Sequence, residues 1–163
     1  MLQRLTIKNY AIIDDLDIGF ANNLNIITGE TGAGKSIVIG ALSLILGERA
    51  DSKSLFRQEG KCVIEGHFDV SAYDGLKDFF TENDLDFDAK TTLRREISVD
   101  GKSRAFVNDT PVNLSILKSL GEQLVDIHSQ HETIALNAEA FQLLVVDGFC
   151  QHKALLSDYS NQY

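Results

Sequence analysis

A glycine-rich loop constrains this chain more than any other feature of its sequence. The residues Gly29-Glu30-Thr31-Gly32-Ala33-Gly34-Lys35-Ser36 match the pattern G-x-x-x-x-G-K-[ST]. The short apolar stretch Leu24–Ile27 precedes the loop, and a dense apolar run of helical length, ending near Gly47, follows it. A strand that leads through such a loop into a helix is the context in which this pattern binds phosphate. The sequence therefore predicts an α/β fold built around a phosphate-binding loop (P-loop).

The residue types of the loop suit ATP and its Mg²⁺ ion. Gly29, Gly32 and Gly34 let the backbone turn successive N–H groups toward phosphate oxygens. The positive end of the following helix strengthens that field. We expect all residues of the loop to contact the nucleotide, with Lys35 neutralising the β- and γ-phosphates and Ser36 binding Mg²⁺.

Hydrolysis needs further groups, namely an acidic residue at the end of an apolar strand and a side chain that positions water. The stretch Leu143–Asp147 imitates the first, but the helical pattern on both sides of it favours a helix. Gln130 is the better candidate, because it follows a predicted short strand at Gln123–Ile127. We expect its amide to bind Mg²⁺ or to orient the attacking water. The neighbouring histidines and Glu132 match no zinc spacing.

The remaining elements are predicted from periodicity and from turn residues. Alternation predicts strands over residues 2–8, 12–20 and 62–70. A hairpin is expected over residues 91–107, turning at Asp100-Gly101. Helices are expected over residues 75–83, from Pro111 to Leu120, and from Glu139 to the end of the chain.

Composition limits the class of protein. The 163 residues are 44% hydrophobic and 24% charged, which is typical of a soluble globular protein. No apolar run reaches the roughly 18 residues of a membrane helix, and no signal peptide is evident, so we expect a cytoplasmic protein. Cys62 and Cys150 have no paired spacing and are expected to be reduced, buried thiols.

The net charge of −9 argues against a surface that is basic all over, so contact with DNA would need a local patch. Cations outnumber acids on the predicted hairpin, although a solvated strand face is the preferred explanation of those charges. The cations are Lys90, Arg94, Arg95, Lys102 and Arg104, against Glu96 and Asp100.

Taken together, two segments resemble the RecN family, bacterial DNA-repair ATPases related to the SMC proteins. The first is LTIKNYAIIDDLDIGFANNLNIITGETGAGKSIVIGALSLILGERAD, and the second is DIHSQHE, which is similar to the glutamine loop of that family. The resemblance covers essentially the whole chain. It implies a P-loop NTPase fold of the ABC-ATPase head type, of which this chain is the N-terminal half, with an antiparallel β part.

The resemblance also implies a division of the chain and a set of partners. Residues 1–137 would form the N-terminal half of the head, and residues 138–163 would form a truncated helix leading toward a coiled coil. A C-terminal half would supply the missing catalytic groups, because no LSGGE-like signature is present here. Ser36 and Gln130 would bind Mg²⁺. Two heads would enclose ATP as a homodimer, and the full-length protein would act on DNA double-strand breaks.

Three other interpretations stay open at this point. The first is another SMC-like head of the RecF type, although DIHSQHE favours RecN. The second is a self-contained phosphotransferase such as a nucleotide kinase, although the arginines are few and scattered. The third is an interaction module in which the P-loop only stabilises the fold.

Overall fold

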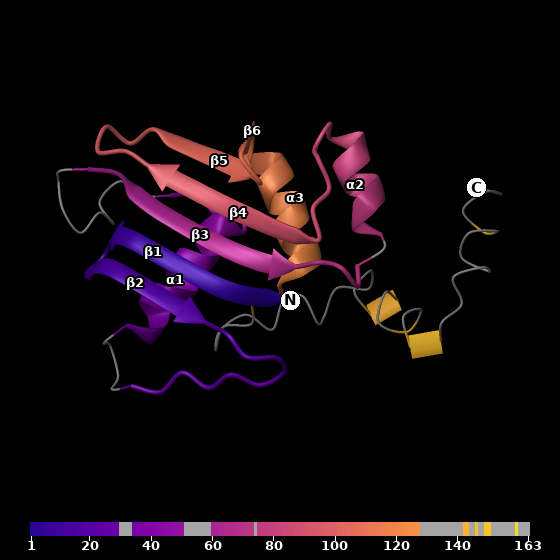
Figure 1. Ribbon diagram of the computed structural model, residues 1–163, viewed down its shortest axis with the longest axis horizontal. Coiled ribbons are helices and arrows are strands. Elements are labelled where there is room, and N and C mark those ends of the chain that lie inside the picture. Colours follow the sequence, from indigo (N-terminus) through magenta and orange to yellow (C-terminus); the bar gives the residue numbers. More distant parts are fainter. Residues whose placement is uncertain are drawn as a thin grey trace. The chain divides into compact units, whose positions relative to one another are not determined.

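Alternating apolar and polar residues build one antiparallel sheet (Figure 1). Its order is β2-β1-β3-β4-β5-β6. The strands are β1 (Leu2–Tyr10), β2 (Ile13–Gly19), β3 (Cys62–Asp69), β4 (Lys90–Ile97), β5 (Ser103–Val107) and β6 (Thr110–Val112). The computed structural model describes residues 1–29, 34–50, 60–73 and 75–127, together with residues 142, 143, 146, 149, 150 and 159.

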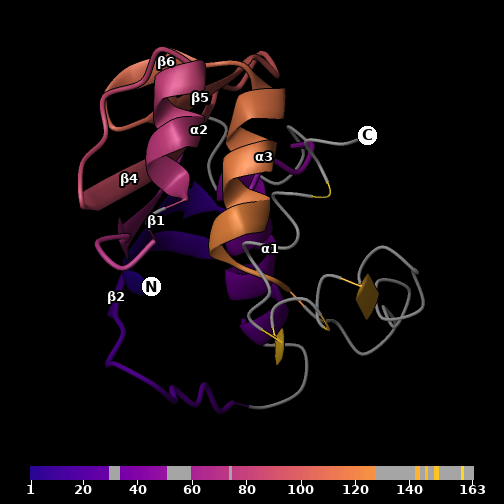
Figure 2. The ribbon, with the colours of Figure 1, turned by 90° about the vertical axis from the view of Figure 1, so that its right-hand side faces the viewer.

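Two helices cover one face of this sheet, α1 (Lys35–Ile45) and α3 (Leu114–Leu124) (Figure 2). The core lies between them and the inward side chains of the strands. Its fully buried members include Leu5, Ile7, Ala41, Ile45, Ile64, Phe68, Leu93, Ile97, Val107, Leu117 and Leu120. The short helix α2 (Leu76–Glu82) follows β3 and buries Leu76 and Phe80. No described helix covers the opposite face of the sheet (the open face), whose outward side chains, such as Glu65, His67, Thr92 and Arg94, are mostly polar (Figure 1).

Glycines let α1 approach both the sheet and α3. A Cβ added to Gly66 would lie 2.5 Å from Cδ1 of Ile45, so α1 rests directly on β3 at this point. A Cβ added to Gly121 of α3 would lie 2.9 Å from the Cα of Leu46. Gly47 follows α1 with a positive φ of 97°, and a Cβ added to it would lie 2.5 Å from the Cα of Lys118 in α3. Side chains at these positions would push the layers apart.

Most elements predicted from periodicity are confirmed. The strands expected over residues 2–8, 12–20 and 62–70 are β1, β2 and β3, and the helix expected over 75–83 is α2. The hairpin is formed by β4 and β5, whose register pairs Ile97 with Ser103. Of the turn dipeptide, only Gly101 has a positive φ, 78°. The turn is therefore one of the longer hairpin loops, in which a glycine follows the bend.

Two predicted elements are wrong, and one helix begins later than predicted. Leu24–Ile27 is not a strand, because within the described residues it has no neighbouring strand to pair with; Leu24 is 79% exposed. The helix expected from Pro111 to Leu120 is α3, but it begins at Leu114. Pro111 lies in the edge strand β6, where a missing N–H is tolerated. Gln123–Ile127 is not a strand, because α3 continues to Leu124 and the chain after it forms no strand.

The chain divides into two compact units, Met1–Asp126 and Ile127–Tyr163. In the second unit, Leu143 and Val146 are helical. This supports the helical interpretation of the stretch before Asp147, which itself lies outside the described residues. Within the part of the chain that the structure describes, no helix combines the length and hydropathy that a membrane crossing requires.

Candidate phosphate-binding loop

The described part of the P-loop consists of its two ends, Gly29 and Gly34–Ser36. Gly34 is the N-cap of α1 and has φ 125°, a conformation open to glycine but strained for other residues. The helix begins at Lys35, so Lys35 and Ser36 occupy its first turn, as the sequence predicts. The middle of the loop, Glu30–Ala33, lies outside the described residues.

The lysine side chain bridges the two ends of the loop. Nζ of Lys35 donates a hydrogen bond to the carbonyl oxygen of Gly29, the residue at which the described part of the loop begins. The ammonium group therefore lies against Gly29, the first residue of the loop, and is carried by the first turn of α1. A phosphate at this position would meet a positive charge and the positive end of a helix together.

The first turn of α1 fits a phosphate and its metal ion. The N-cap is a glycine and no side chain caps the helix. The first N–H groups of any helix lack a carbonyl partner within the helix, which makes this end suited to an anion. Ser36 is an exposed residue of this first turn. The hydroxyl is a hard oxygen ligand of the kind Mg²⁺ prefers. The residues present therefore suit ATP with Mg²⁺.

Gln130, the second predicted metal ligand and water-positioning residue, lies outside the described residues, as do His128, His131 and Glu132. Its role stays a prediction. Among the described residues, no group of three or more His, Cys, Asp or Glu side chains is arranged to hold a metal ion.

The cations of the hairpin do not form a basic patch. Arg95 points into the core and is only 3% exposed, with Nε bonded to the Ser103 hydroxyl at 2.6 Å. Desolvation in the core lowers the pKa of its guanidinium. Lys102 lies 2.8 Å from a carboxylate oxygen of Asp100. A solvated strand face therefore explains the exposed cations such as Lys102, but not Arg95, which is buried.

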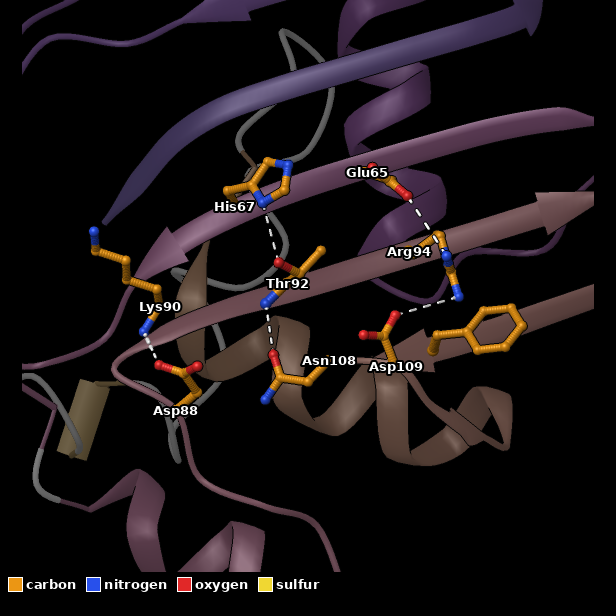
Figure 3. Close-up of a pocket in the computed structure, with 9 residues that line it drawn as sticks. Glu65, His67, Asp88, Lys90, Thr92, Arg94, Asn108 and Asp109 are labelled. Atoms are coloured by element: carbon orange, nitrogen blue, oxygen red, sulfur yellow. Dashed lines mark hydrogen bonds and ion pairs between the residues drawn. The ribbon is translucent and has the colours of Figure 1, made fainter.

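The open face of the sheet contains a polar pocket of about 310 Å³ (Figure 3). Arg94 lies in its wall, stacked 4.3 Å over the ring of Phe106. Its guanidinium is 3.8 Å from Glu65, 3.8 Å from Asp109 and 3.9 Å from Glu96. Charges of both signs therefore offset one another here. Sequence reasoning missed this pocket, although the every-second-residue pattern of outward polar side chains in β3 and β4 was a usable signal.

The two cysteines are free, as expected, but only one is buried. Burial raises the pKa of the Cys62 thiol to about 11. Cys150 is exposed, so the expectation that both thiols are buried is wrong for it.

Comparison with known proteins identifies the family of this chain. The AAA domain family matches residues 4–156. DNA repair protein RecN of Haemophilus influenzae is 39% identical over all of this chain, which covers 30% of that protein. RecN of Bacillus subtilis is 37% identical, again over all of this chain and 29% of the relative. The chain thus spans about a third or less of the length of these curated relatives.

Solved structures share the fold. The SMC head domain from Thermotoga maritima has a TM-score of 0.53 at 25% identity, covering 73% of this chain and 41% of that one. A structure from work on ATP-driven dimerization and DNA-stimulated activation of SMC ATPases has a TM-score of 0.63 at 16% identity. It covers 90% of this chain and 97% of that chain. The fold is that of an SMC-type ATPase head. The chain belongs to the AAA domain family and corresponds to the N-terminal segment of RecN proteins.

Proposed function

We propose that this chain is the ATP-binding N-terminal part of the head of a RecN-like DNA-repair ATPase. The observation that carries the proposal is the placement of Lys35 and Ser36 in the first turn of α1, directly after Gly34 with its positive φ. In this role the residues from Gly29 to Ser36 hold the phosphates. Lys35 neutralises the β- and γ-phosphates, and Ser36 and Gln130 bind Mg²⁺.

A site of this kind is incomplete in one chain segment. We expect residues 1–137 to form half of the head and residues 138–163 to lead toward a coiled coil. The exposed segment before the P-loop supports an incomplete head, because Leu24 and Ile26 are 79% and 75% exposed. Several large apolar side chains exposed within one short segment mark a surface that a partner covers. A C-terminal half of the head would cover them and would supply the groups for hydrolysis.

Head engagement and DNA binding belong to the full-length protein. Two heads, joined as a homodimer with ATP between them, would complete each site. We expect DNA contacts outside the open face of this sheet, because its charges are balanced: Lys61 lies 3.4 Å from Glu96, and Arg94 has three acidic neighbours. Such a protein would act in the bacterial cytoplasm, at the nucleoid.

The test is a nucleotide-binding titration of this chain with Mg²⁺-ATP, beside a steady-state hydrolysis assay. Lys35→Ala should abolish binding. Lys77→Ala, which removes an equal charge from an exposed position of α2, should not. Hydrolysis by the chain alone should stay at the level of the Lys35→Ala variant. Lys35-independent binding would overturn the assignment of the site.

The same assays separate the alternative functions. Robust Lys35-dependent turnover by the isolated chain would favour a self-contained phosphotransferase. It would contradict the proposal that this chain carries only part of an ATPase site. An interaction module would keep its partner binding in Lys35→Ala. The likeness of the fold to SMC heads supports the ATPase head over both alternatives.

A further inference from the structure

In the half of α1 that begins at the P-loop, no residue is fully buried, and Val38 packs against the core while only partly buried. The fully buried residues of the helix are Ala41, Leu44 and Ile45, all in its second half. The close approach to β3 at Ile45 also lies there. Nearer the loop, Ile39 is 49% exposed. The core therefore holds the end of α1 that is remote from the phosphates.

One close contact lies between these two regions. A Cβ added to Gly40 would be 3.0 Å from the hydroxyl oxygen of Tyr10 and 4.0 Å from its ring carbon Cζ. Tyr10 is the last residue of β1, at the turn into β2. Desolvation by burial, followed by the nearby Cys62 thiol, raises the pKa of its hydroxyl, which agrees with a tip packed against protein.

The contact lies near the loop along the helix axis. Gly40 is five positions after Lys35, so it is only about 7.5 Å further along α1. Protein interiors are packed densely enough to transmit such a contact as a shift of the whole helix end. The loop residues must be held within roughly half an ångström of their working position to bind well.

We propose that Tyr10 is a positioning residue for the P-loop, and that the contact of its hydroxyl end with Gly40 sets the orientation of the first half of α1. The proposal rests on the proposed nucleotide binding. Gly40 is a glycine in this account because the tip of Tyr10 fills the space of a side chain. Tyr10 itself touches no nucleotide.

The test is a double-mutant cycle of Gly40→Ala and Tyr10→Phe, read by the affinity for Mg²⁺-ATP. Gly40→Ala alone should weaken binding by at least about twofold, the lower end of the coupling between residues in contact. In the Tyr10→Phe background the same change should leave affinity unaltered, because the oxygen is gone and the next ring atom is 4.0 Å away. Ile45→Val is the matched control, since it trims the core-bound half of α1 and should lower stability without changing affinity.

Amide hydrogen exchange gives a readout that does not need a nucleotide. Alanine is a better helix former than glycine, so Gly40→Ala should slow exchange of the amides of residues 38–40, the first that donate within α1, in the Tyr10→Phe background. With Tyr10 in place, Gly40→Ala should not slow exchange, because the added methyl group displaces this end of the helix. Equal slowing in both backgrounds, or equal loss of affinity in both, would overturn the proposal. Failure of the wild-type chain to bind ATP would instead refute the proposed function, and the exchange comparison would still decide the role of Tyr10.

Discussion

Replacing Gly66 with alanine should destabilise the fold, because α1 rests on β3 at this residue. The new Cβ would lie 2.5 Å from Cδ1 of Ile45 and 2.9 Å from Cε2 of Phe68. Carbon atoms normally approach to about 3.5–4.0 Å, so either α1 or the two side chains must move by roughly 1 Å. Overpacking of this kind costs about 1–3 kcal/mol. The loss of glycine from a strand returns about 0.5–1 kcal/mol, so the net loss is about 1 kcal/mol at the middle of the two ranges.

Urea unfolding followed by circular dichroism measures this change, and the thermal midpoint should fall by roughly 3–8 °C. Ile45→Val removes the closest carbon atom, so the double variant should be more stable than the sum of the two single effects predicts. Gly19→Ala is the control, because nothing lies within 4 Å of its added Cβ. A Gly66→Ala variant that is as stable as the wild type would refute the close-packing argument.

Other predictions concern thiols, acid stability and a helix cap. Iodoacetamide at pH 8 should label exposed Cys150 and spare Cys62, whose pKa is raised to about 11 by burial; mass spectrometry showing equal native labelling would contradict this. Lys102 and then Ser98 lower the pKa of Asp100 to about 2, so its contribution to stability is complete above the unfolded value of about 3.9 and is lost as the pH falls toward 2. Asp100→Asn should therefore make the free energy of unfolding less dependent on pH in that window. An unchanged pH dependence would contradict the stabilisation of the Asp100 carboxylate by Lys102 and Ser98. Asn113→Ala should cost about 1 kcal/mol in urea unfolding, because Asn113 accepts the N–H of Ile116 at 2.9 Å, whereas Asn113→Ser should retain most of the cap.

The features predicted well from sequence depend on a few neighbouring residues. Strand alternation gives β1, β2 and β3 because the core covers only one face of the sheet. The change of period at Lys35 marks the start of α1, since the P-loop pattern requires a helix at that point. The turn at Asp100-Gly101 follows from the conformational freedom of glycine. In each case the local signal and the tertiary environment agree.

The errors arise where two local rules compete. Pro111 suits a helix start, but it also suits an edge strand, and the side chain of Asn113 caps the helix two residues later. Gln123–Ile127 is too short for its pattern to separate strand from helix. The spacing of Leu117, Leu120 and Leu124 continues the helical period, which was the better signal.

Arg95 shows that the alternation of side chains along a strand, and not the charge of a residue, decides which face of the sheet a side chain occupies. Leu93 and Ile97 face the core, so the residue between them at the same parity must face it too. Counting Arg95 among the available cations of the hairpin ignored this rule. The remaining cations of the open face have acidic neighbours, as the register of Glu96 opposite Arg104 illustrates. Composition alone could not reveal that balance, since it depends on cross-strand pairing.

The segment before the P-loop is the most informative disagreement between sequence and structure. Leu24, Ile26 and Ile27 have the composition of a buried strand, yet all three are about half exposed or more. A strand forms only where a neighbouring strand accepts its hydrogen bonds, and none of the described strands reaches this segment. The local pattern and the fold of this segment are reconciled if the missing neighbour belongs to the C-terminal half of the proposed head. Because the same segment leads into Gly29, covering it would also fix one end of the loop whose other end α1 already holds. Completion of the sheet and completion of the nucleotide site would then be one event.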